Sequence, residues 1–195
     1  RRGPAGAGAP DEPRRAAVRA AAEAVSALGH DPDDPSCTLV AALVEPGRRR
    51  VSVGWVGDSR AYWLGADGEN RVLTTDHSWA AEAVAAGLLD EAAAAADRRA
   101  HAITRWLGPG QQPEPGLTSF TAHGPGTLLV CSDGLWNYLP DPARLAEVAG
   151  DTRDAPAAAQ RLTEHALEAG GRDNITVAIV GVGDVGASNT EGDSR

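Results

Sequence analysis

The chain has 195 residues and a net charge of −9 at pH 7. This length suits one domain with a buried core, and the acidic balance, with no basic cluster to offset it, argues against nucleic acid as a partner. No run of about 18 apolar residues is present, so the sequence predicts no membrane span.

The N-terminal part of the chain is predicted to be a disordered segment or linker followed by one helix. Residues 1–13 are rich in Gly, Pro, Ala and Arg and carry no strand pattern. Apolar residues at helical spacing predict a helix over 14–28, and Gly29 is a natural stop. Prolines interrupt the acidic loop that follows, which favours a solvated loop over a metal site for its three acids, Asp31, Asp33 and Asp34.

Val-rich runs then predict an antiparallel meander rather than a parallel α/β sheet. The expected strands are 37–45, 50–57, 61–64 and 71–73. The turn 66–69 should close a hairpin, and the arginines at 48–50 should occupy an exposed hairpin loop. Cys37 and Cys131 both lie in apolar runs, so we expect them to be small core residues in a reducing, cytoplasmic compartment. A redox pair is the alternative if their strands are neighbours.

The second half of the chain alternates helices and strands outside that meander. Two helices are expected over 79–86 and 90–97, broken at Gly87, with Ser78 and Asp90 as N-caps. The elements expected after them are strands 117–122 and 127–131, a turn at 135–138, helices 142–149 and 156–169, and a last strand 175–182. We therefore predict one α+β domain over residues 14–183 and a disordered tail over 184–195.

Three acidic tripeptides adjoin these apolar runs. They are Gly57-Asp58-Ser59, Ser132-Asp133-Gly134 and Arg172-Asp173-Asn174. Carboxylates that converge at the ends of buried strands can form an oxygen-rich site for a hard divalent cation. For each Asp taken alone a simple turn is the favoured interpretation, because Asp-Gly and Asp-Asn favour turns. The prediction of a metal site depends on all three together.

The residues around these tripeptides resemble a known family. The relevant segments are 56–62 (Val-Gly-Asp-Ser-Arg-Ala-Tyr), 73–78 (Leu-Thr-Thr-Asp-His-Ser), 103–108 (Ile-Thr-Arg-Trp-Leu-Gly), 129–136 (Leu-Val-Cys-Ser-Asp-Gly-Leu-Trp) and 171–177 (Gly-Arg-Asp-Asn-Ile-Thr-Val). In content, order and spacing they resemble the metal-dependent Ser/Thr protein phosphatases of type 2C, in their bacterial form. The likeness covers about residues 36–182.

The resemblance implies a four-layer α-β-β-α sandwich, in which two antiparallel sheets are flanked by helices. It implies hydrolysis of phosphoserine and phosphothreonine in phosphorylated protein substrates, with two Mg²⁺ or Mn²⁺ ions and a third, weaker one. Asp133 and Asp173 match ligands of the two-metal centre, and Asp58 matches the ligand of the third ion. Gly134, Asn174, Ser59 and Arg60 match supporting positions. His77 and Ser78 match the motif before a mobile flap, and we expect a structural role for His77.

The chain departs from the family pattern before Ser36. No segment there matches the family's first strand, with its acidic residue and phosphate-binding Arg, or the Asp-Gly pair that bridges the two metals. The chain also contains no Met. We therefore expect it to be the C-terminal two-thirds of a phosphatase domain, incomplete at the N-terminus and weak or inactive by itself. The alternative is a non-catalytic pseudophosphatase module that binds phosphorylated partners.

Overall fold

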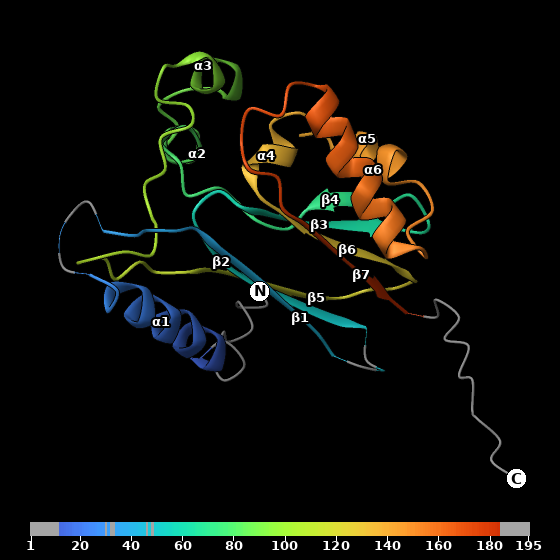
Figure 1. Cartoon of the computed structure of the whole chain (residues 1–195), viewed down its shortest axis with the longest axis horizontal. Coiled ribbons are helices and arrows are strands. Elements are labelled where there is room, and N and C mark those ends of the chain that lie inside the picture. The colour runs from blue at the N-terminus through green and yellow to red at the C-terminus, as the bar shows by residue number, and fades with distance from the viewer. Residues whose placement is uncertain (1–11, 30, 32–33, 46, 48, 184–195) are drawn as a thin grey trace, which may run out of the picture.

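Seven strands in the described part of the chain form two antiparallel sheets, which pack face to face (Figure 1). The computed structural model describes residues 12–29, 31, 34–45, 47 and 49–183. The first sheet has the order β1-β2-β5, with β1 at Leu39–Glu45, β2 at Arg50–Val56 and β5 at Gly116–Thr121.

The second sheet has the order β4-β3-β6-β7. Its strands are β3 (Arg60–Gly65), β4 (Asn70–Val72), β6 (Gly126–Cys131) and β7 (Val177–Val182). Arg60 lies opposite Cys131, and Cys131 lies opposite Val177. Since these pairs are antiparallel, the start of β3, the end of β6 and the start of β7 meet at one end of this sheet.

Alternation of side chains along the strands separates two apolar cores. Between the sheets, Val51, Val53 and Trp55 of β2 pack with residues of the facing strands such as Trp63 and Leu128. The opposite faces of β3 and β6 bury another set against the helices, namely Tyr62, Leu64, Leu129 and Cys131.

Helices cover both outer faces of the sandwich (Figure 1). The first sheet is covered by α1 (Glu12–Ser26), whose Val18 and Ala22 pack near Val56 and Leu107. The second is covered by α5 (Pro142–Ala149) and α6 (Ala155–Glu168). The predicted four-layer α-β-β-α architecture is thus confirmed. None of the helices in the described part of the chain is long and apolar enough to cross a bilayer.

Three further helices lie at the end of the sandwich where β3 begins. They are α2 (Trp79–Ala85), α3 (Glu91–Ala96) and the short α4 (Asp133–Trp136). Ser78 caps α2 and Asp90 caps α3 as predicted, each accepting a backbone N–H of the first turn. The sequence predicted only a turn at 135–138, whereas helix α4 already begins at Asp133.

The prediction that Cys37 is a core residue is wrong. Cys37 is exposed, because β1 begins only at Leu39 and Cys37 makes just an isolated backbone bridge to Leu107. Cys131 is buried as expected, and both thiols are free.

In the acidic loop the Asp34 carboxylate accepts the Asp31 N–H, as in a turn. Asp33, residues 1–11 and the tail 184–195 lie outside the described residues.

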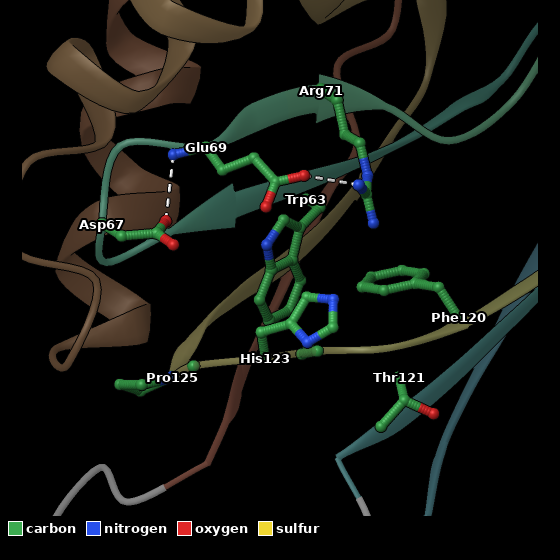
Figure 2. Close-up of a pocket in the computed structure, with 10 residues that line it drawn as sticks. Trp63, Asp67, Glu69, Arg71, Phe120, Thr121, His123 and Pro125 are labelled. Carbon is green, nitrogen blue, oxygen red and sulfur yellow. Dashed lines mark hydrogen bonds and ion pairs between the residues drawn. The ribbon is translucent and has the colours of Figure 1, made fainter.

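The opposite end of the sandwich carries a cavity of about 440 Å³ between the β3–β4 hairpin and the end of β5 (Figure 2). Trp63 and Phe120 meet edge to face there, with ring centroids 5.3 Å apart. The Arg71 guanidinium lies 4.5 Å from the Phe120 ring centroid and pairs with Glu69 at 2.5 Å.

Candidate metal centre

Sheet register brings the three acidic tripeptides to one end of the second sheet. Asp58 lies just before β3, Asp133 just after β6 and Asp173 shortly before β7, and these strand ends are neighbours. The sequence predicted each strand end separately, but it could not give the strand order that makes them adjacent. The observed order β3-β6-β7 places Asp133 just beyond the end of the middle strand of the three.

The turn that carries Asp58 needs a glycine in front of it. Gly57 has φ of 104°, which favours glycine, and a Cβ there would overlap the Thr38 side chain. On the other side of Asp58, the Ser59 hydroxyl hydrogen-bonds the Thr38 hydroxyl at 2.9 Å. Thr38, which lies just before β1, therefore contacts this turn at Gly57 and at Ser59, the residues on either side of Asp58.

Asp133 and Asp173 are joined by hydrogen bonds between their segments. The Ser132 N–H donates to the Thr176 carbonyl at 3.1 Å. Its hydroxyl donates to the Asn174 carbonyl and accepts the Thr176 N–H, each at 3.0 Å. A Cβ on Gly134 would overlap the Asn174 carbonyl oxygen, so glycine lets α4 approach the turn after Asp173. Gly134 and Asn174 thus lie in contact.

The three carboxylates form an electrostatic series with Asp133 in the middle. Burial raises the pKa of Asp133 above its ordinary value, and the neighbouring Asp173 carboxylate raises it further. Burial likewise raises the pKa of Asp58, and the Asp133 carboxylate adds to that shift. The two charge interactions mean that each of these carboxylates has a second negative charge nearby. A bound cation would offset the repulsion between them.

The oxygen donors at this site suit a hard divalent cation, but the described residues do not form a complete set of ligands for one. Carboxylate oxygens are the ligands that Mg²⁺ and Mn²⁺ prefer. Within the described residues, however, no group of three His, Cys, Asp or Glu side chains has a geometry that could hold a metal ion. Asp133 has Asp58 as its electrostatic neighbour on one side and Asp173 on the other, and a cation held by either pair would need water or further groups to complete its coordination.

Several residues that the sequence did not single out hold the Asp58 turn in place. The Asp76 carboxylate accepts two hydrogen bonds from Arg60, and the Trp136 indole Nε1–H donates to the Asp58 carbonyl at 2.9 Å. Asp76 and Trp136 both lie within the motifs that resemble the family, and those motifs were the signal that could have identified them. Their partners depend on strand register and were not predictable.

His77 has a structural position beside the same turn. Its backbone N–H donates to the Gly57 carbonyl at 2.9 Å, and its Nδ1 accepts the Gly57 N–H at 3.1 Å. Trp55 stacks on the imidazole, with ring centroids 6.1 Å apart. Burial lowers the pKa of His77, and the Arg105 charge lowers it further. A neutral imidazole that accepts a backbone N–H fits the expected structural role.

The segment with α2 and α3 lies close to the carboxylates. His101, which follows α3, lowers the pKa of Asp133 through its electrostatic interaction with that carboxylate, in opposition to burial. This segment is anchored at its base, where the Thr104 N–H donates to the His77 carbonyl at 2.8 Å and Ser78 bridges Ile103.

Comparison with known proteins gives consistent matches. The sequence model of the family described as protein phosphatase 2C matches residues 8–169. The serine/threonine protein phosphatase PstP of Mycobacterium tuberculosis is 33% identical over 178 residues, which are 90% of this chain and 34% of that protein. The serine/threonine phosphatase stp of Listeria innocua is 36% identical over 143 residues, covering 73% of this chain and 55% of that protein. The chain thus spans between a third and about half of the length of these relatives.

Solved structures show the same fold. A serine/threonine phosphatase from S. agalactiae matches with a TM-score of 0.77 and 30% identity, covering 90% of this chain and 72% of that one. The catalytic domain of PstP, solved in complex with two manganese ions, matches with a TM-score of 0.71 and 33% identity, covering 91% of this chain and 73% of that one.

Proposed function

Because the chain belongs to the protein phosphatase 2C family, we propose that it forms the C-terminal part of a domain that hydrolyses phosphoserine and phosphothreonine in proteins. The chain covers 72% and 73% of two solved phosphatase chains, which supports its assignment as part of such a domain. The observation that carries the proposal is the series of three carboxylates, Asp58, Asp133 and Asp173, at one end of the second sheet.

In this proposal the carboxylates divide the ligand roles as the family resemblance implies. Asp133 and Asp173 bind the main pair of divalent cations, and Asp58 binds a third, weaker cation together with Asp133. The position of Asp133 between the other two supports this division, because one carboxylate can serve both sites with its two oxygens. Mg²⁺ and Mn²⁺ both suit carboxylate and water ligands.

Bound divalent cations would supply a water of lowered pKa and offset charge on the transferring phosphoryl group. The residues of this chain provide the positions for that chemistry. The hydrogen bonds of Ser132 fix the separation of the Asp133 and Asp173 segments. Arg60 is committed to Asp76 by two hydrogen bonds and so does not replace a phosphate-binding Arg. We accordingly expect this chain alone to contribute metal ligands but little turnover.

The substrates in this proposal are phosphorylated proteins in the cytoplasm. Two free thiols are consistent with a reducing compartment. The segment with α2 and α3, which lies beside the carboxylates, is the natural candidate for a surface that contacts the protein substrate.

A phosphatase assay on two proteins tests this proposal. The complete product of the gene and this 195-residue chain would each be given Mn²⁺ and a phosphothreonine peptide. We expect metal-dependent release of phosphate from the complete product, little from the chain, and loss of activity in Asp173→Asn of the complete product. A complete product that binds phosphorylated peptides without turnover would instead support the pseudophosphatase alternative.

A further inference from the structure

Arg60 lies in a part-buried cluster that joins three segments of the site. Its Nε and Nη2 donate to the two carboxylate oxygens of Asp76 at 2.9 and 2.7 Å. The side chains of Arg60 and Asp76 are only 18% and 13% exposed. The guanidinium also stacks on Trp136, 3.6 Å from the ring centroid. Arg60 is therefore fixed by a two-point ion pair on its edge and by an aromatic ring on its face.

Trp136 connects this cluster to two of the acidic residues. It belongs to α4, the helix that Asp133 opens, so its position moves with Asp133. Its indole Nε1–H donates to the backbone carbonyl of Asp58 at 2.9 Å. One side chain thus ties the helix of Asp133 to the turn of Asp58, and Arg60 holds that side chain in the orientation that the hydrogen bond needs.

Asp76 extends the cluster to the opposite side of the same turn. The next residue, His77, binds both the N–H and the carbonyl of Gly57. The turn is consequently held before Asp58 through Gly57, at Asp58 through Trp136, and after Asp58 through Arg60.

These contacts oppose a specific electrostatic strain. Asp58 and Asp133 carry like charges at the paired ends of β3 and β6, so the two carboxylates repel each other. Without a rigid connection the two carboxylates would move apart whenever no cation lies between them. A buried ion pair by itself adds little net stability, because desolvation offsets much of the attraction, so its value lies in fixing geometry.

We propose that Arg60, Asp76 and Trp136 form a brace that sets the separation of Asp58 and Asp133, so that these three are positioning residues for cation binding by that pair. The brace rests on the proposed function for the identity of its ligand, a divalent cation. The brace residues are not ligands themselves and act through the Asp58 carbonyl and the α4 helix.

The test measures Mn²⁺ binding to the 195-residue chain by calorimetry. Trp136→Phe keeps the ring but removes the indole N–H, and Arg60→Lys keeps the charge but loses the two-point contact. Each should weaken binding about tenfold or more, as loss of a residue that orients a ligand typically does. Arg71→Lys is the matched control, because Arg71 also pairs with a carboxylate and lies over an aromatic ring, at the far end of the sandwich (Figure 2). It should leave binding unchanged.

A double-mutant cycle separates positioning from general stability. In an Asp58→Ala background, Trp136→Phe should have no further effect on Mn²⁺ affinity. An equal loss in both backgrounds, or unchanged binding in Trp136→Phe and Arg60→Lys, would overturn the brace.

A second measurement tests the brace without any cation. If the unaltered chain binds no Mn²⁺, the proposed function fails for this chain, but the rigidity of the brace can still be measured on the metal-free protein. Hydrogen exchange of the Trp136 indole N–H should be slow in the unaltered chain and in Arg71→Lys but fast in Arg60→Lys, and equally slow exchange in all three contradicts the brace.

Discussion

At the scale of single residues, two glycines allow the backbone next to the acidic residues to pack closely against neighbouring segments. Gly57 allows the turn before Asp58 to pass Thr38, and Gly134 allows α4 to pass Asn174. Neither glycine can be replaced by a larger residue without moving a backbone segment that carries a carboxylate. The glycines within the acidic motifs are thus as much part of the site as the aspartates.

Gly134→Ala should destabilise the chain and widen the site. The added methyl group would overlap the Asn174 carbonyl oxygen, so α4 and the turn after Asp173 must separate. Overpacking of this kind costs about 1–3 kcal/mol in the free energy of unfolding. Gly124→Ala is the control, because a Cβ at Gly124 meets nothing within 4 Å. Urea denaturation of both variants measures the difference, and equal midpoints would refute the close approach.

His77 should make stability depend on pH just below neutrality. Its folded-state pKa is lowered, mainly by burial, from the ordinary value of 6.5. Below pH 6.5 the unfolded chain therefore binds more protons at this position than the folded chain. The contribution of His77 to stability is fully present above pH 6.5 and is lost as the pH falls through the lowered folded pKa.

An NMR titration of the imidazole signals checks this prediction directly. The groups that act on His77 are Arg105, which lowers its pKa, and Glu82 and Asp76, which oppose that shift. We expect a midpoint below 6.5 and an Nε2–H tautomer above it, since Nδ1 accepts the Gly57 N–H. A midpoint at or above 6.5 would contradict the buried, neutral position.

At the scale of elements, the sequence predicted regular strands and helices well where a local pattern decides them. The run predicted as strand 127–131 is β6, and the predicted helix 142–149 has the same bounds as α5. Cys37 was misassigned because an apolar run does not reveal where pairing with the next strand begins. Helix α4 was missed because four residues are too few to show helical periodicity.

The candidate site was predictable only in part. Asp58, Asp133 and Asp173 could be named from their motifs, since each adjoins an apolar run. Their adjacency depends on the strand order β3-β6-β7, which is set by long-range pairing and not by local sequence. The same holds for the contacts of Arg60 and Trp136, which join segments far apart in the chain.

The segment with α2 and α3 should be the most dynamic helical part of the described chain. Of the residues in these two helices only Ala83 and Ala94 are buried, and both are small. Local opening therefore exposes little apolar surface. In hydrogen-exchange mass spectrometry, amides of α2 and α3 should exchange much faster than those of β6. Protection equal to that of β6 would show that this segment is not a mobile flap.

At the scale of the whole molecule, the sandwich has two different ends. One end gathers three carboxylates that repel one another, and the other holds an aromatic cavity with its own ion pair (Figure 2). The length of β3 separates the two ends, because this strand begins beside the carboxylates and runs toward the hairpin beside the cavity. Changes at the cavity should therefore affect stability without affecting cation binding.

The central claim is that Asp58, Asp133 and Asp173 together bind divalent cations. Calorimetric titration of the chain with Mn²⁺, beside Asp133→Asn and the charge-matched Glu168→Gln, tests it most directly. Glu168 is exposed on α6, so its variant should bind as the unaltered chain does. We predict that Asp133→Asn loses most of the binding, because Asp133 is the carboxylate shared by both pairs. Undiminished Mn²⁺ binding in Asp133→Asn would contradict the claim.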